Sequence, residues 1–147
     1  MQAVASSESG ETTLTVYYSA ESNSQAPSLS DFEHIKVIGR GTFGKVVLVK
    51  QKDTGQAFAM KILRKDIILD ADVLESTLLE KEILLKAEHP FLMGMYYMFQ
   101  NDQKIFFVMR FSRGGELFSH LSAEGRFSEE RARFYSIQIA LAFGYLH

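Results

Sequence analysis

Residues suited to holding a phosphate group stand at three points of this chain. A glycine-rich run at residues 39–46, Gly-Arg-Gly-Thr-Phe-Gly-Lys-Val, fits the pattern G-x-G-x-x-G-x-V. Lys61 follows inside the apolar run Ala57–Leu63, and in a helix Glu80 would share a face with Ile83 and Leu84. Glycines let the backbone close over phosphates, and a lysine neutralises phosphate charge. These residue types together favour a nucleotide-binding site.

The residues after the glycines decide which nucleotide fold they suit. In dinucleotide-binding folds the third glycine opens a helix. Here Val46–Val49 follows, a β-branched run that favours a strand. This disfavours a nicotinamide-dependent oxidoreductase and predicts a hairpin lid, while a glycine-rich hairpin without a ligand stays open for this motif alone. The predicted lid residues are Gly39, Gly41, Thr42, Phe43 and Gly44.

Lys61 and Glu80 are each awkward alone, because an unpaired charge among apolar side chains is costly. A Lys61–Glu80 pair would remove both problems and would point the lysine at the α- and β-phosphates of a nucleotide. The alternatives are a strand lysine that reaches water and a glutamate that is simply solvated among its charged neighbours. We predict the pair, and with it a catalytic role for both residues.

Five short runs rich in Val, Ile, Phe and Tyr must position these groups, and turn residues separate them. Asp53-Thr54-Gly55 and Asn101-Asp102-Gln103 predict hairpins, so the sheet should be antiparallel. The predicted strands are Phe32–Ile38, Lys45–Lys50, Ala57–Leu63, Met95–Gln100 and Ile105–Met109.

Good helix formers fill residues 70–87, and His89-Pro90 ends that helix. After Met109 the pattern becomes helical, with a short helix at Glu116–Ala123 and a longer one that begins at Ser128. Apolar residues on one face of the last helix predict an exposed stripe, consisting of Phe134, Ile137, Leu141 and Tyr145.

The composition, with 46% hydrophobic and 23% charged residues among 147, is that of a globular protein. A net charge of −2 without a basic stripe argues against nucleic acid as a partner. There is no cysteine, no apolar run of membrane-spanning length and no signal peptide pattern, so we expect a cytoplasmic protein that could also enter the nucleus.

Residues 1–31 are dominated by Ser, Thr, Glu, Gln and Ala. Such a segment has too few large apolar groups to offset the entropy of ordering it. We predict a flexible tail, and docking of the apolar patch Leu14–Tyr18 as a short strand is the alternative.

Four phrases reveal a family resemblance: DTGQAFAMKIL, HPFL, GGELFSHL and GRFSEERARFY. With the motifs above, they make Phe32–His147 resemble the first part of a serine/threonine protein kinase domain of the AGC group, especially the cyclic-AMP-dependent kinase and protein kinase B. The resemblance implies an α+β fold with an incomplete helical second lobe. It divides the chain into an ATP-binding lobe at 32–109, a hinge at 110–113 and the start of the second lobe at 114–147.

By the same resemblance, Ile38, Val46 and Ala59 would line the adenine pocket, although core packing could explain Val46 and Ala59 equally well. Met109 would be the gatekeeper and Phe43 the lid tip. Backbone groups of the hinge residues Arg110-Phe111-Ser112 would bind the adenine edge, where relatives usually carry an acid at the Arg110 position.

The resemblance further implies that Glu116 contacts the ribose and a substrate arginine, unless it only complements a helix dipole. A pocket for an aromatic tail motif would be formed by Lys65, Leu69, Gln100 and Ile105, although Leu69 and Ile105 could equally be ordinary core.

The implied reaction is transfer of the ATP γ-phosphoryl group to Ser or Thr hydroxyls of proteins, with magnesium. The catalytic loop and the Asp-Phe-Gly metal site would lie beyond His147, so no metal ligand is assigned here and the chain alone is expected to be inactive. A non-catalytic nucleotide-binding or docking module is the alternative.

Overall fold

The structure, a computed structural model, describes residues 3–8, 11–17, 27–68 and 71–147. The chain divides into two compact units. The first combines residues up to Lys86 with Gly94–Phe111, and the second combines Ala87–Met93 with Ser112–His147. The division after Phe111 falls inside the predicted hinge.

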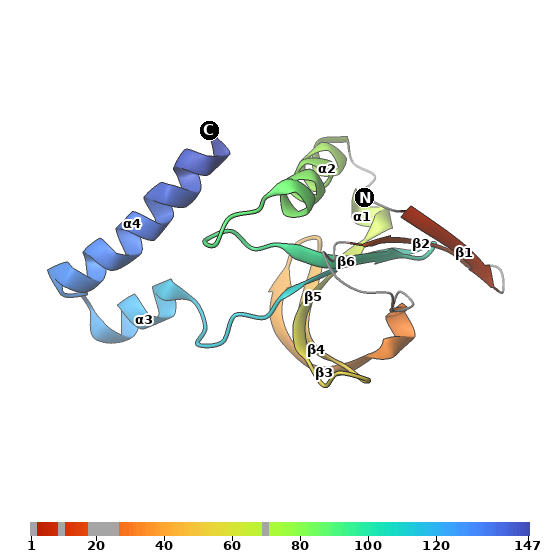
Figure 1. The fold of residues 1–147 in the computed structure, drawn as a ribbon, viewed down its shortest axis with the longest axis horizontal. Coiled ribbons are helices and arrows are strands. Elements are labelled where there is room, and N and C mark those ends of the chain that lie inside the picture. The colour runs from red at the N-terminus through yellow and green to blue at the C-terminus, as the bar shows by residue number, and fades with distance from the viewer. Residues whose placement is uncertain (1–2, 9–10, 18–26, 69–70) are drawn as a thin grey trace. The chain divides into compact units, whose positions relative to one another are not determined.

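One antiparallel sheet makes up most of the first unit (Figure 1). All five predicted strands are present, as β3 (Phe32–Gly41), β4 (Gly44–Gln51), β5 (Ala57–Arg64), β6 (Met95–Gln100) and β7 (Lys104–Arg110). Their order in the sheet is β6-β7-β5-β4-β3. The β4–β5 turn places Gly55 at a φ of 70°, a backbone conformation that favours glycine.

Two further strands, β1 (Ala3–Glu8) and β2 (Glu11–Tyr17), bring the sheet of the described residues to seven strands. Val16 of β2 pairs with Met98 of β6, so the alternative of a docking strand describes this segment better than a tail. The predicted tail is therefore corrected for residues 3–8 and 11–17. The physical reason is that β6 would otherwise leave a row of unpaired backbone groups at the sheet edge, and the Thr- and Val-rich β2 pairs well there.

Before β3 lies a short 3-10 helix, η1 (Leu29–Asp31), also inside the predicted tail. Asp31 accepts a hydrogen bond from the Ser28 backbone N–H at 2.6 Å, and the Lys52 ammonium donates to the Ser30 carbonyl at 2.6 Å. These bonds fix the entry of the chain into the sheet.

The sheet has a hydrophobic cluster on each face. The first cluster includes Phe107 and Met109 together with Leu85 of the helix α2 (Ala71–Lys86). The helices α1 (Lys65–Ile68) and α2 cover this face, here called the helix face (Figure 1). The opposite face, here called the outer face, carries an aromatic-rich cluster around Phe58 and Phe99. The alternation follows from the pleat, since successive side chains of a strand point to opposite faces.

The helix predicted at residues 70–87 is α2 (Ala71–Lys86). A one-turn helix, α1 (Lys65–Ile68), precedes it and was not predicted. Ile68, Leu84 and Leu85 pack with the helix-face cluster, so the two helices rest on the sheet through these apolar side chains.

The second unit contains α3 (Leu117–Glu124) and α4 (Glu129–Leu146). Ser128 caps α4 as predicted, because its hydroxyl accepts a hydrogen bond from the Arg131 N–H. Arg131 also binds Glu124 at 2.6 Å and lies over the Phe127 ring, which joins the two helices. The four residues of the predicted apolar stripe on α4 are exposed in this chain.

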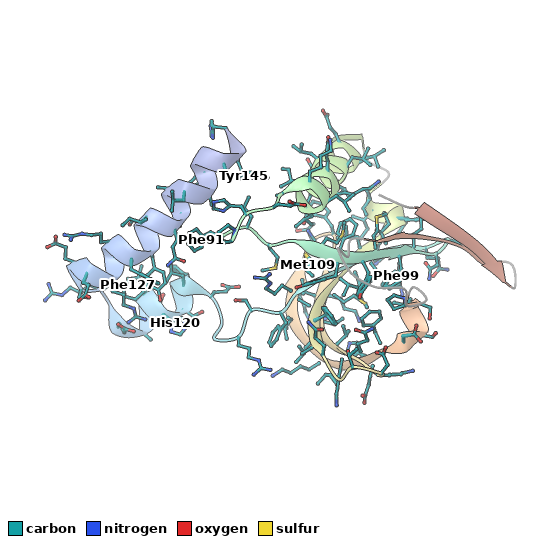
Figure 2. The ribbon with its side chains drawn as sticks, viewed as in Figure 1. Phe91, Phe99, Met109, His120, Phe127 and Tyr145 are labelled. Atoms are coloured by element: carbon teal, nitrogen blue, oxygen red, sulfur yellow. The ribbon has the colours of Figure 1, made fainter. Side chains whose placement is uncertain are left out.

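Residues 87–93 pack on the end of α4. The Glu88 N–H donates to the Tyr145 hydroxyl at 3.1 Å, and the His89 and Tyr145 rings lie 5.1 Å apart. Figure 2 shows Tyr145 and Phe91 in this part of the second unit. Within the described residues, no helix is long and apolar enough to cross a membrane.

Candidate functional site: a glycine hairpin beside a lysine–glutamate pair

The glycine-rich run forms the predicted hairpin. Gly41 of β3 pairs with Gly44 of β4, and Thr42 and Phe43 form the turn between them. The strand β4 continues from Gly44 without a helix, which argues against a dinucleotide-binding fold. Thr42 and Phe43 are exposed, so the backbone of the turn is accessible to a ligand.

Lys61 and Glu80 form an ion pair. The Lys61 ammonium donates to both carboxylate oxygens of Glu80, at 2.5 and 2.7 Å. The side chains are 28% and 40% exposed, so each keeps access to water and to a ligand. The pair joins the middle of β5 to the helix α2. It is the pair predicted from the cost of leaving either charge alone among apolar side chains.

Another acid of α2, Glu82, has a partner of its own. Glu82 binds Lys86 at 2.6 Å, and this hydrogen bond lowers the pKa of the Glu82 carboxyl below its ordinary value. The same contact raises the pKa of Lys86. Glu82, which is exposed and two residues after Glu80, is therefore engaged with Lys86.

The sheet register places four candidate residues on the helix face. Val46 is the partner of Lys61 across β4 and β5, and Ala59 is the partner of Met109 across β5 and β7. Partners across a ladder point to the same face, and Ala59 and Lys61 are two residues apart on one strand. Val46, Ala59 and Met109 thus lie on the same face of the sheet as Lys61.

This arrangement suits a ligand with a flat apolar part and an anionic part. Apolar side chains supply dispersion contacts to a ring system, and the paired ammonium supplies charge to phosphates. The described residues contain no group of three or more His, Asp or Glu side chains placed to hold a metal ion. The Lys61 ammonium and the backbone of the hairpin are groups that can bind phosphate oxygens.

A family model of the protein kinase domain matches residues 32–147. The chain belongs to the protein kinase family. RAC-beta serine/threonine-protein kinase B of Xenopus laevis is 50% identical over 120 residues, which cover 82% of this chain and 25% of that protein. Human RAC-beta serine/threonine-protein kinase is 49% identical with the same coverage, and Caenorhabditis elegans akt-1 is 49% identical with 22% of its length covered.

These relatives place the kinase chain in the AGC group, as the four phrases indicate. The chain spans about a quarter of the length of these curated relatives. The five-stranded antiparallel arrangement and the helix α2 agree with the kinase fold that the resemblance implies.

No ladder pairing links the other predicted site residues, Ile38, Phe111 and Glu116, to Lys61. Ile38 falls at a register irregularity between Val37 and Gly39, so the ladder gives it no partner. Phe111 is half-buried just past the end of β7. Glu116 belongs to the second unit, where it is the N-cap residue of α3 and makes no side-chain capping hydrogen bond.

Three of the four residues of the predicted tail-motif pocket come together. Gln100 and Ile105 are partners across β6 and β7, and Ile105 packs against the helix-face cluster. The Lys65 N–H donates to the Gln103 carbonyl at 2.9 Å, which brings α1 to the same hairpin. Leu69, the fourth residue, lies outside the described residues.

Two features of the site were missed. Phe107 is the β7 partner of Lys61 and is almost fully buried, so it lies beside the lysine in the ladder. Gly44 makes a close backbone approach to β5 that no other lid glycine makes. The apolar strand pattern could have indicated Phe107, but the Gly44 contact depends on tertiary structure that the pattern does not contain.

Proposed function

We propose that the protein to which this chain belongs transfers the γ-phosphoryl group of ATP to Ser or Thr hydroxyls of proteins, with magnesium. The observation that carries the proposal is the Lys61–Glu80 ion pair beside the glycine hairpin. The relatives named serine/threonine-protein kinases support the class of reaction.

In this proposal Lys61 holds the α- and β-phosphates, and Glu80 orients Lys61. Backbone N–H groups of the hairpin cover the phosphates at Gly39, Gly41, Thr42, Phe43 and Gly44. The adenine ring packs against Ile38, Val46, Ala59 and Met109, and Phe111 offers backbone groups to its edge. Such positioning accounts for much of phosphoryl-transfer catalysis, because the chemistry needs alignment and charge stabilisation more than covalent help.

Magnesium, when bound, neutralises charge on the phosphate oxygens. No residue among those described is assigned as a magnesium ligand. Lys61 and the hairpin backbone supply the part of phosphate binding that this chain can provide. The sequence 1–147 contains no Asp-Phe-Gly segment, so the isolated chain should not transfer phosphate.

The proposed protein substrates carry an arginine upstream of the acceptor hydroxyl, where the exposed Glu116 carboxylate can bind it and the ATP ribose. A peptide array on the full-length protein tests this. An array without preference for upstream arginine would exclude the role for Glu116.

A second proposed partner is an aromatic motif, often a kinase's own C-terminal tail, that binds at Lys65, Leu69, Gln100 and Ile105. Lys65, Gln100 and Ile105 lie at the α1 end of the sheet, and this position would couple binding of the motif to α2 and so to Glu80. Unchanged activity and tail binding in full-length Leu69→Glu would exclude this pocket.

We also propose that the reaction takes place in the cytoplasm or nucleus, where ATP and protein substrates are present.

The direct experiment compares full-length wild type with Lys61→Met in transfer of labelled γ-phosphate to Ser- and Thr-containing peptides. Wild type should transfer phosphate, and Lys61→Met should lower kcat by about 100-fold or more, since transition-state charge loses its partner. A wild type that binds ATP without transferring phosphate would support the non-catalytic module instead.

A further inference from the structure

The three lid glycines meet different surroundings within the protein. A Cβ atom on Gly41 would have no atom within 4 Å, and one on Gly39 would lie an ordinary 3.6 Å from the nearest Val46 atom. A Cβ atom on Gly44 would lie 1.9 Å from the Ile62 carbonyl oxygen, 3.0 Å from the Ile62 carbonyl carbon and 3.2 Å from the Leu63 Cα. Only at Gly44 does the protein itself exclude a side chain.

Backbone conformation does not explain the glycine at this position. Gly44 has no positive φ, so its backbone is open to any L-residue. The excluding atoms are backbone atoms of β5, which cannot rotate away as a flexible side chain could. Since carbon–oxygen contacts are ordinarily about 3.3–3.6 Å, an alanine would have to separate β4 from β5 by more than about 1 Å.

The close approach lies next to Lys61 in the same ladder. Gly44 pairs with Leu63, and two positions further along the strands Val46 pairs with Lys61. One residue before Gly44, the Phe43 carbonyl accepts a hydrogen bond from the Arg64 N–H at 3.2 Å. The C-terminal side of the hairpin turn is thus attached to the strand that carries the lysine.

We propose that Gly44 is a positioning residue: its missing side chain lets β4 lie directly against β5, and this contact fixes the hairpin turn relative to Lys61. Gly39 and Gly41 then differ from Gly44 in the reason why a glycine is required. Their protein surroundings leave room for a methyl group, so any requirement for glycine there comes from the bound ligand. The nucleotide part of this inference rests on the proposed function, whereas the contact between the strands does not.

The test compares Gly44→Ala, Gly41→Ala and Gly94→Ala in the full-length protein. Gly94 is a matched control, because a Cβ atom there also meets nothing within 4 Å and the residue lies outside the site. Amide hydrogen exchange at Arg64 reports the contact with Phe43, and steady-state kinetics report the effect on the reaction. A backbone shift of about 1 Å beside a reacting group can lower the rate by about 100-fold.

We expect Gly44→Ala to speed exchange at Arg64 by tenfold or more and to lower kcat, and Gly94→Ala to change neither. Gly41→Ala should leave Arg64 exchange unchanged while raising the KM for ATP. Equal exchange rates at Arg64 in Gly44→Ala and Gly41→Ala would overturn the inference. The exchange result stands even if wild type transfers no phosphate, a result that would refute the proposed function alone.

Should Gly44→Ala fail to fold, wild type still provides a test. Its Arg64 amide should exchange as slowly as the neighbouring ladder amides of β5 and much more slowly than the Thr42 amide at the turn. An Arg64 amide as fast as Thr42 would show that β4 and β5 are not held together at Gly44.

Discussion

The Lys61–Glu80 pair is better suited to orienting a group than to stabilising the fold. Both side chains keep part of their surface in water, with 28% and 40% exposed. Ion pairs with such exposure contribute about 0–1 kcal/mol to the free energy of unfolding. A bidentate hydrogen bond at 2.5 and 2.7 Å nevertheless fixes where the ammonium points. The pair therefore has a stronger explanation in ligand binding than in stability.

The effect of the Arg110 side chain on ATP binding depends on which face of the sheet it occupies. It pairs with Phe58, a member of the outer-face cluster, whereas its neighbour Met109 lies on the helix face with Ala59. Because the side chain points away from the Lys61 face, Arg110→Glu should change the affinity for ATP by less than about twofold. Calorimetric titration of the full-length variant with ATP measures this. A tenfold change in affinity would mean that the Arg110 side chain reaches the nucleotide.

At the scale of elements, the outer-face cluster holds the sheet together independently of the site. Phe32, Phe58 and Phe99 lie in contact, with ring centroids 5.8–6.0 Å apart for the two pairs that include Phe32. Figure 2 shows Phe99 among the side chains of the first unit. Rings at these separations add directional contacts to a large buried apolar area. Stability should therefore depend on this cluster more than on the ion pair.

Phe99→Ala should lower the free energy of unfolding by about 3–5 kcal/mol, because it empties a space that is only 1% exposed. Chemical denaturation of full-length wild type and Phe99→Ala measures this loss. A loss of less than about 1 kcal/mol would contradict the assigned core.

At the scale of the whole molecule, elements set by local sequence were predictable and those set by distant partners were not. The β-branched runs indicated β3–β7, and Ser128 followed by two acids indicated the start of α4. The strand β2 forms against β6, which lies about 80 residues away along the chain, so the apolar patch Leu14–Tyr18 indicated a docking strand only as an alternative and did not identify its partner. The helix α1 has four residues, too few for a helical period to show.

The candidate site also contains features that local sequence predicted and one that depends on tertiary contacts. Lys61 and Glu80 were predictable because each charge stood in an apolar pattern that required a partner. The role of Gly44 was not, because its reason is a backbone contact with Ile62 across the ladder. Glycine in a motif indicates close approach but does not tell whether a ligand or the protein makes it.

The measurement that tests the central claim most directly is kcat of the full-length Glu80→Gln variant beside Glu82→Gln. Both substitutions remove one carboxylate charge from α2, but only Glu80 binds Lys61, whereas Glu82 binds Lys86. We predict that Glu80→Gln lowers kcat by about tenfold or more, with less than about 1 kcal/mol lost from the free energy of unfolding, and that Glu82→Gln leaves kcat unchanged. Equal kcat values for the two variants would contradict the claim that Glu80 positions Lys61 for phosphoryl transfer.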